Sequence, residues 1–396
     1  MKKYISVLFL ALAVALASGC SEEDHFIREG SDGSAPASVS ELQVESLPGG
    51  AKISYKVPAD KDLLFVKAKY RVNSQTERET KTSAFTNFIV VDGFGDMEEK
   101  TISITTVDRG GVESSPVEVK VTPMEPPVTS VFKTLELRED FAGVNMTWQN
   151  EHLANLAFII LAKNDDGVLE EREAVYSSVE EGDFTLRGLD TLKNVFGAYV
   201  RDRWENRSDT ILAELKPLFE EEIDRTKWSQ LSGAGEVDLA NWGGSFRAMV
   251  DYRTGISNYG HTKGNESLPL YFSWDMKAKA KLSRIKIWQR PGGYQFQHQN
   301  PRVYEIWGSN DPSTDGSFSG WTKLITCESI KPSGLPYGKV SQEDNALVNR
   351  GEEFKFPAAA SAYRYLRFVM LANWTPGGKD LHISEMGCWG RVEESF

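Results

Sequence analysis

Three stretches of the chain place aromatic rings beside planar hydrogen-bonding groups. Two are loops rich in Gly and Pro, residues 290–300 and 373–380, and the third joins Trp242 to Tyr259 and His261. Flat apolar rings can pack on the C–H faces of a sugar, while amide, guanidinium and imidazole groups can bond its hydroxyls. The predicted ligand-binding residues are Trp242, Tyr259, His261, Arg290, Tyr294, Gln295, His298, Asn373, Trp374 and Lys379.

A purely structural role is the alternative for these aromatic residues. Trp242, Tyr294 and Trp374 would then close the end of a β-sandwich without contacting a ligand. Gly and Pro keep such stretches out of strand ladders, so a loop can present its side chains to solvent. Eight of the ten tryptophans lie at or beyond Trp228, which makes the C-terminal part the expected ligand-binding part.

No motif in the sequence indicates an enzyme. The chain has no Gly-x-Ser-x-Gly elbow, no His-Glu-x-x-His pair and no phosphate-binding loop. Its 57 acidic residues include no carboxylate pair in a recognisable glycosidase setting, and the runs Glu98–Glu99 and Glu220–Glu222 are interpreted as solvated faces. The histidines are scattered, which indicates neither a triad nor a zinc site; they are His25, His152, His261, His298 and His382.

Charge excludes two classes of partner. The formal net charge is -12, so polyanions such as nucleic acid and anionic lipid are not expected to bind. We therefore expect contact with a membrane only through a lipid anchor.

The N-terminus predicts export and lipidation. Lys2 and Lys3 precede an apolar run too short to cross a bilayer comfortably, and small residues then lead to Cys20. This arrangement resembles the bacterial lipobox, with residues 1–19 as the signal peptide and Cys20 as the acylated residue. The acidic run Glu22–Asp24 resembles the surface-export signal of Bacteroidetes lipoproteins. An ordinary secreted protein whose cleavage site adjoins a Cys is the alternative.

The composition then predicts a flexible tether and a series of β domains. Residues 20–36 are rich in Ser, Gly, Glu and Asp and cannot support a core. Short alternating runs follow, typical of antiparallel sheets with one solvated face. We expect domains at residues 37–123, 124–217 and 228–396, the last two joined by a charged connector.

An internal repeat supports the first two domains. The run Ala51–Tyr55 is similar to Val144–Trp148, and Asp108–Ser114 is similar to Asp202–Ser208, at offsets of 93 and 94 residues. That spacing is close to the length of one immunoglobulin-like sandwich. Two tandem sandwiches are therefore predicted, with chance similarity of two strands as the alternative, and the first resembles a fibronectin type III domain.

The strand pattern of the third domain predicts a jelly-roll β-sandwich. Strands are expected at residues 270–275, 282–288, 303–307 and 365–370. Cys327 and Cys388 both lie in this domain, and the sequence leaves open whether they form a disulfide or are buried free thiols. The predicted fold class is thus all-β: two tandem Ig or fibronectin III-like sandwiches followed by this jelly roll.

The ordered motifs of residues 240–390 resemble the discoidin, or coagulation-factor type C, domain. They include Tyr259–Thr262, Tyr271–Met276, Glu305–Asp311, Arg364–Arg367 and Ser384–Glu385, in the order that the family has. The resemblance implies a galactose-binding-like module with ligand loops at one end. It also implies a structural calcium near Asp251 and Glu385. Tyr259 and Gly260 replace the usual Trp before His261, and no Cys lies near residue 228 for the familiar disulfide, so neither ligand class nor disulfide carries over.

The whole arrangement resembles the lipoproteins encoded in polysaccharide-utilisation loci of Bacteroidetes. The resemblance implies a surface-exposed outer-membrane lipoprotein that binds polysaccharide or oligosaccharide and supports its capture and uptake, with an outer-membrane transporter complex as a possible partner. The alternative is a non-enzymatic scaffold or protein-binding, adhesion component of an outer-membrane complex. Aromatic loops gathered at one end of the third domain would favour glycan binding, and an exposed aromatic patch on residues 37–217 would favour the alternative.

Overall fold

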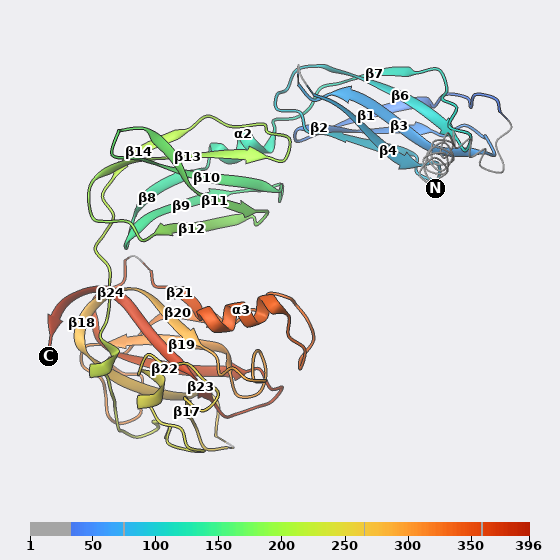
Figure 1. Ribbon diagram of the computed structural model, residues 1–396. Helices are drawn as coiled ribbons and strands as arrows, with labels where there is room; N and C mark the ends of the chain where they lie inside the picture. The colour runs from blue at the N-terminus through green and yellow to red at the C-terminus, as the bar shows by residue number, and fades with distance from the viewer. Residues whose placement is uncertain (1–32, 74–75, 265, 358) are drawn as a thin grey trace, which may run out of the picture. The chain divides into compact units, whose positions relative to one another are not determined.

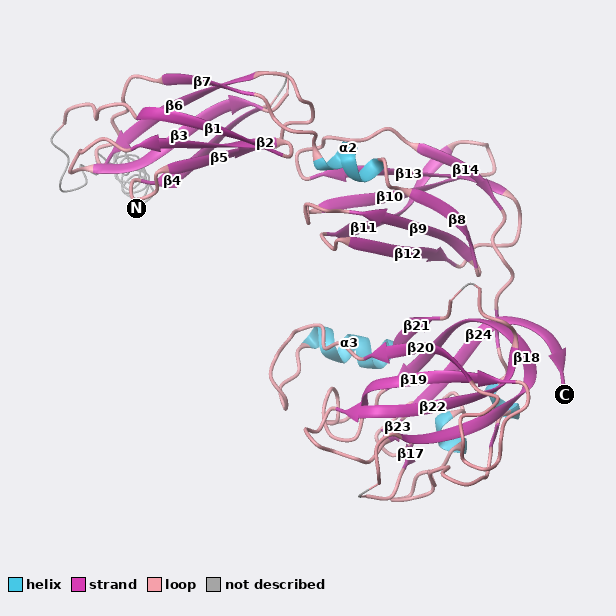
Figure 2. Cartoon of the chain, turned by 180° about the vertical axis from the view of Figure 1, so that it is seen from behind, coloured by secondary structure: helices cyan, strands magenta, loops and turns pink. Residues whose placement is uncertain are grey.

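The described part of the chain has an all-β fold, and its strands form three sets of sheets (Figure 1, Figure 2). The computed structural model describes residues 33–73, 76–264, 266–357 and 359–396. The predicted signal peptide, Cys20 and most of the tether lie outside the described residues. Within those residues, no helix combines the length and apolar character needed to cross a membrane.

Residue contacts divide the chain into two compact units. The boundary between them runs through the middle set of sheets. The first unit comprises the chain up to Glu136, 147–183 and 197–212, and the second comprises 137–146, 184–196 and the chain from Ala213 onward.

The first sandwich has two sheets, with strand orders β1-β2-β5 and β4-β3-β6-β7. The alternation seen in the sequence matches the burial: Ile53 and Tyr55 of β2, and Val66, Ala68 and Tyr70 of β3, point into the core. Its strands are β1 (Ser40–Leu47), β2 (Gly50–Lys56), β3 (Leu63–Arg71), β4 (Glu77–Ser83), β5 (Phe88–Asp92), β6 (Lys100–Asp108) and β7 (Val117–Val121).

The second sandwich repeats this topology strand for strand, which confirms the predicted repeat. Its sheets have the orders β8-β9-β12 and β11-β10-β13-β14. They face each other where the Trp148 ring of β9 stacks on Phe158 of β10, with 3.9 Å between ring centroids. The elements are α2 (Pro127–Phe132), β8 (Glu136–Asp140), β9 (Gly143–Gln149), β10 (Leu156–Lys163), β11 (Leu169–Ser177), β12 (Glu181–Arg187), β13 (Asn194–Asp202) and β14 (Ile211–Leu215).

Gly182 of β12 makes room for the buried Trp148 ring. A Cβ at this position would lie 1.8 Å from Trp148 Cε2. Because the ring is held on its other side by Phe158, we expect Gly182→Ala to lower the free energy of unfolding by about 1–3 kcal/mol. Chemical unfolding checks this, with Gly264→Ala as the control because a Cβ there meets open space. Equal stability of the two variants would contradict the packing.

The third sandwich is built around one 19-residue strand, β18 (Leu270–Trp288). The main sheet has the order β15-β24-β18-β22-β19-β20; β16 and β21 also pair with β18, and β17 pairs with β23. The elements are β15 (Glu221–Glu222), η1 (Arg225–Lys227), β16 (Ser229–Gln230), η2 (Arg247–Met249), β17 (Gly260–His261), β19 (Pro301–Ser309), β20 (Thr322–Glu328), α3 (Gln342–Arg350), β21 (Glu352–Lys355), β22 (Tyr363–Asn373), β23 (His382–Ile383) and β24 (Glu385–Ser395).

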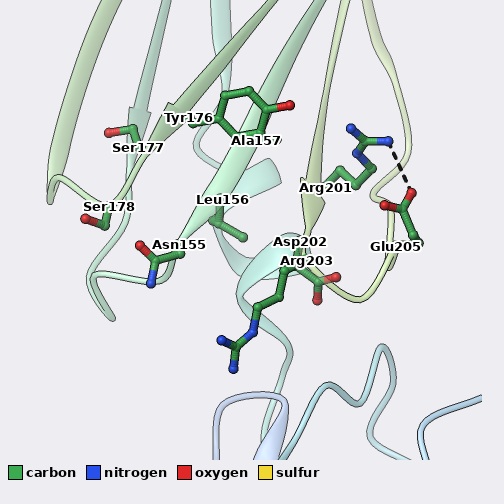
Figure 3. A pocket seen from close by; sticks show the side chains of 10 residues that line it. All are labelled: Asn155, Leu156, Ala157, Tyr176, Ser177, Ser178, Arg201, Asp202, Arg203 and Glu205. Atoms are coloured by element: carbon green, nitrogen blue, oxygen red, sulfur yellow. Dashed lines mark hydrogen bonds and ion pairs between the residues drawn. The ribbon is translucent and has the colours of Figure 1, made fainter. Parts of the chain in front are cut away.

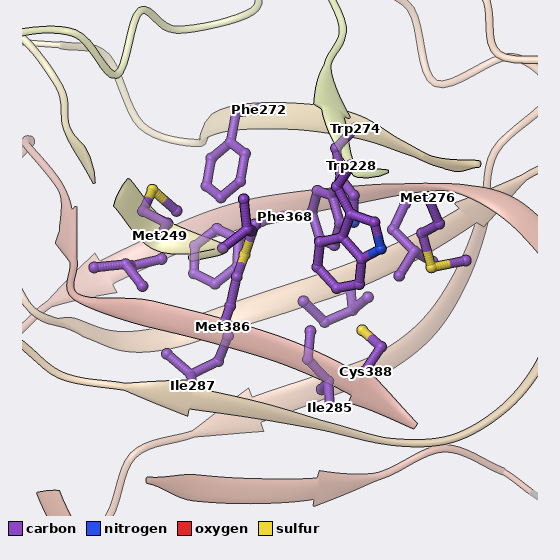
Figure 4. Packing of buried hydrophobic residues seen from close by; sticks show 14 of the residues in the cluster. Trp228, Met249, Phe272, Trp274, Met276, Ile285, Ile287, Phe368, Met386 and Cys388 are labelled. Atoms are coloured by element: carbon purple, nitrogen blue, oxygen red, sulfur yellow. The ribbon is translucent and has the colours of Figure 1, made fainter. Parts of the chain in front are cut away.

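The core of the third sandwich is aromatic and sulfur-rich. Trp228 stacks on Trp274, with Met276 and Cys388 among the buried neighbours (Figure 4). Cys327 and Cys388 are both buried free thiols, so the open question of a disulfide is answered in favour of thiols. Burial raises the pKa of each thiol, which keeps both protonated.

The interpretation of Glu220–Glu222 as a solvated face is wrong for Glu220, whereas Glu221 is exposed as expected. The Glu220 side chain is 5% exposed and forms a two-point ion pair with Arg284, with Nη2 2.9 Å from Oε2 and Nε 3.2 Å from Oε1. Glu221 and Glu222 pair with β24, and Ile223 enters the core of the third sandwich. One carboxylate of an acidic run can thus be buried when a guanidinium neutralises it.

Candidate functional site

The short sheet of β17 and β23 brings together two distant loops of the third sandwich. Gly260 pairs with Ile383, and His261 pairs with His382. Directly opposite residues in an antiparallel pair have neighbouring side chains. The pairing therefore places the predicted Tyr259–His261 segment beside β23, the short strand that precedes the last strand of the domain.

A continuous series of rings extends from this pair in both directions. Centroid distances are 6.4 Å from Trp242 to His261, 6.0 Å from Tyr259 to His261 and 5.5 Å from His261 to His382. The series continues from His382 to Tyr294 at 5.3 Å. It then runs from Tyr294 to His298 at 5.1 Å and from His298 to Tyr337 at 6.3 Å. We call this set the aromatic strip: Trp242, Tyr259, His261, His382, Tyr294, His298 and Tyr337.

The strip has exposed ends and a buried middle. Trp242 is 74% exposed and Tyr337 is 49% exposed, whereas Tyr259, His261 and His382 are buried. The buried rings support the exposed ones, since the Tyr259 hydroxyl donates to the Trp242 carbonyl at 2.6 Å. The exposed rings therefore stand on a packed base, which lowers the entropy cost of binding a ligand.

Arg290 lies between two tyrosines of the strip. Its guanidinium is 3.7 Å from the Tyr259 ring centroid and 4.3 Å from that of Tyr294. Arg290 Nε donates to the Ile256 carbonyl at 2.8 Å, which fixes the orientation of the guanidinium plane. Among the described residues, the two terminal nitrogens have no hydrogen-bond partner, so they can donate to a ligand.

Two further groups on the strip can bond a hydroxyl. Burial lowers the pKa of His261, and its Nδ1 lies 2.6 Å from the Thr262 carbonyl. Nδ1 therefore carries the proton of the neutral ring, and Nε2 is an acceptor. The Tyr294 hydroxyl has no hydrogen bond within the described residues, and it can both donate and accept.

Left-handed backbone conformations cluster in the loops of the strip. Trp242, Phe296 and His298 have φ of 54°, 52° and 56° although none is glycine. Such conformations cost about 1–3 kcal/mol each and persist where the surroundings hold them, often at ligand sites. Phe296 is fully buried, whereas Trp242 and His298 are exposed.

The other predicted residues have different surroundings. Gln295 bonds Asn345 and Gly293, and Asn373 bonds Asp380 and Thr375, so both hold loops in place. The half-buried Trp374 ring packs edge-on against Phe296 at 5.3 Å. Lys379 is exposed. The structure thus brings together Trp242, Tyr259, His261, Arg290, Tyr294 and His298 of the predicted set.

Two strip residues were missed by the sequence reasoning. Tyr337 lies in a Pro-Tyr-Gly loop, which is the kind of signal that did identify Tyr294. His382 gives no local signal, because only its pairing with His261 shows its place.

The calcium site implied by the resemblance does not fit the structure. The Asp251 carboxylate accepts from the Arg253 side chain and from Asn258, and Glu385 accepts from the Arg253 backbone N–H at 3.0 Å and from Arg225. Calcium takes six to eight oxygen ligands. No group of three or more His, Cys, Asp or Glu side chains among the described residues can hold a metal ion.

Arg225 supplies positive charge where the resemblance implied calcium. Its guanidinium is buried, with Nη1 3.1 Å from Glu385 and 2.9 Å from the Met386 carbonyl, and Nη2 2.9 Å from Glu222. It also lies 4.0 Å from the Tyr252 ring centroid. Burial raises the pKa of Glu385 to about 7, and Arg225 opposes that rise. Arg225 thus joins the beginning of the third sandwich to its last strand, β24.

The buried histidines predict acid sensitivity. Burial lowers the pKa of His382 well below its usual value, and His261, Arg290 and His298 add to this. Below about pH 6.5 the unfolded chain therefore binds more protons than the folded one, and stability falls as the pH decreases. Asp380 favours protonation of His261, and Glu385, whose pKa is raised, acts in the opposite direction to the histidines.

Comparing the wild type with His382→Leu isolates the contribution of His382. We expect the free energy of unfolding of the variant, relative to wild type, to rise by up to about 1.4 kcal/mol for each pH unit below 6.5. Urea unfolding between pH 5 and 8 measures it. A difference that stays constant over this range would show that His382 does not stay neutral.

Three protein-family models match the chain in succession. Each is described as a domain of unknown function, and they match residues 36–123, 124–226 and 250–390. No curated protein matches the chain.

Fold and site together define a protein of serial β-sandwiches whose C-terminal module carries an aromatic surface strip. Among solved structures, the SusE-like protein BT2857 is 33% identical; the match covers 67% of this chain and 100% of that one, with a TM-score of 0.45. At that identity over the full length of the relative, the chain belongs to the family of SusE-like proteins.

Two other solved structures are more distant. A CBM32 module from a family 31 glycoside hydrolase of Clostridium perfringens is 20% identical, covering 43% of this chain and 95% of its own, with a TM-score of 0.31. An F5/8 type C domain from Bacteroides fragilis is 13% identical, covering 43% and 97%, with a TM-score of 0.30. No functional conclusion rests on these two.

Proposed function

We propose that the protein binds glycan, without catalysis, through the aromatic strip of its third sandwich. The observation that carries this proposal is the gathering of exposed rings and free hydrogen-bonding groups at one place, from loops far apart in sequence. Trp242 and Tyr337 would pack on sugar faces. Arg290, His261 and Tyr294 would bond hydroxyls between them.

The family and the leader support a role at the cell surface. Cys20 would be acylated after removal of residues 1–19, anchoring the protein in the outer membrane with its domains facing outward. The first two sandwiches, residues 37–123 and 124–217, would act as spacers, and the third would extend from about residue 220 to the C-terminus. Captured polysaccharide would stay close to a transporter complex, where a modest single-site affinity suffices because the local concentration is high.

The test is calorimetric titration of the whole chain, without its leader, against xyloglucan, galactomannan, yeast mannan and mucin glycans. We expect saturable heat with one glycan class and its loss in Trp242→Ala. Silence across a broad panel, from a folded protein, would contradict glycan binding. It would favour the protein-binding scaffold as the alternative role.

A further inference from the structure

The second sandwich carries an open hollow of about 490 Å³ (Figure 3). It lies on the sheet β11-β10-β13-β14 and is lined in part by Asn155, Ala157, Tyr176, Arg201 and Arg203. Its volume falls in the range of small-ligand sites, about 300–1,000 Å³. The aromatic strip, on the third sandwich, does not contribute to it.

The hollow exists because a small residue lies between large ones. Ala157 of β10 is directly opposite Tyr176 of β11, so the two side chains share one face of the sheet. Arg201 stands on β13, the next strand after β10. The Tyr176 ring is 75% exposed. The Tyr176 ring is therefore accessible to a ligand, next to the small side chain of Ala157.

The polar rim is rigid and close to neutral. Arg201 pairs with Glu205 at 3.1 Å and Arg203 pairs with Asp92 at 3.1 Å, so neither guanidinium is an unbalanced charge. The buried Asp202 carboxylate accepts from the backbone N–H of Trp204 at 2.8 Å and fixes the turn. This favours an uncharged polar ligand over an anion.

The loop on the other side of the hollow is also held in place. The Asn150 side chain is buried and bonds both the N–H and the carbonyl of Ala154, each at 3.0 Å. The exposed Asn155 amide that follows has no hydrogen bond within the described residues. It is a planar donor and acceptor held at the rim.

A second hollow of about 450 Å³ adjoins the first. The two share Asn155, Leu156, Asp202 and Arg203, and the second continues to Trp204. The two hollows meet at these residues, which leaves room for more than one unit of a chain-like ligand. The combined groove crosses β11, β10 and β13 in turn, whereas a peptide that adds a strand must follow a sheet edge. The geometry is therefore unsuited to a peptide that adds a strand, whereas the exposed ring and the neutral polar rim fit an oligosaccharide.

We infer that this groove is a second binding site for a neutral oligosaccharide segment, with Tyr176 as its stacking platform. The ligand class rests on the proposed function, but the site is separate from the aromatic strip. Two sites on one chain would hold a polysaccharide more tightly than either alone.

The test compares wild type, Tyr176→Ala, Trp242→Ala and the double variant of the whole chain. Each is titrated calorimetrically with hexasaccharides cut from the glycan that binds in the panel. We expect two hexasaccharides per wild-type chain, one per single variant and none for the double variant. Phe85→Ala is the matched control, because that aromatic is fully exposed on the first sandwich and outside both sites.

The other outcomes show which of the two proposed sites is wrong. One hexasaccharide per wild-type chain, lost in Trp242→Ala but kept in Tyr176→Ala, would overturn the groove alone. Loss in Tyr176→Ala with full binding in Trp242→Ala would overturn the strip alone. A wild type that binds no glycan would overturn both.

Discussion

Trp242→Ala should lower the affinity for glycan at least tenfold while leaving the unfolding midpoint unchanged. The ring is 74% exposed, so its removal leaves no cavity in the core. Truncating a stacking aromatic at a binding hot spot typically costs about 2 kcal/mol or more. Tyr294→Ala should act in the same direction, since it also removes the ring beneath Arg290. Calorimetric titration of the whole chain measures both effects.

Trp374→Ala provides the matched contrast. Its ring is half-buried against Phe296, so this variant should lower the unfolding midpoint more than it lowers the affinity of the folded protein. If Trp242→Ala unfolded the domain and Trp374→Ala abolished binding without loss of stability, the roles assigned to the two tryptophans would be reversed.

Arg225→Ala should lower the free energy of unfolding of the third sandwich by about 3–5 kcal/mol. The change leaves the buried Glu385 carboxylate and the Met386 carbonyl without the guanidinium that they contact. Removing one partner of a buried pair leaves an uncompensated charge, which is why the expected effect is large. Urea unfolding at pH 8 measures it.

Arg253→Ala is the control for this prediction. Its side chain is 77% exposed, and Glu385 contacts only its backbone N–H, which the substitution keeps. A small change, about 0.5 kcal/mol or less, is expected. Chelation of calcium should leave the wild-type midpoint unchanged; a drop on chelation together with a mild effect of Arg225→Ala would contradict the role of Arg225.

The sandwiches were predictable because alternation in strands with one buried face is a strong signal. Ile53, Tyr55 and Val66 show it directly, and the repeat of Ala51–Tyr55 at Val144–Trp148 revealed the second copy of the topology. The single strand β18 was read as two, because its middle alternates Lys with Ala and Ala is a weak strand former. A register shift between Asp275 and Ala280 accompanies this segment.

The start of helix α3 has a capping signal in the sequence, although the helix was not predicted. Ser341 and Asp344 form a reciprocal capping box at its start. A nine-residue helix with one buried apolar side chain, Val348, has too little apolar periodicity to stand out among the strand patterns of this domain.

The site was only partly predictable, because long-range pairing assembles it. Loop composition identified Trp242, Arg290 and Tyr294, but composition cannot separate a residue that faces solvent from one that holds its loop, such as Asn373. The calcium expectation considered carboxylates alone, whereas in the structure a guanidinium contacts one of them. Arg225 lies 160 residues before Glu385 in the chain, so no local pattern links them.

Hydrogen–deuterium exchange of the whole chain, with and without the saturating polysaccharide, tests the central claim most directly. Glycan binding to the aromatic strip predicts slower exchange of backbone amides in residues 241–245, 290–300 and 331–340. Protection confined to the first two sandwiches, with these three loops unchanged, would contradict it.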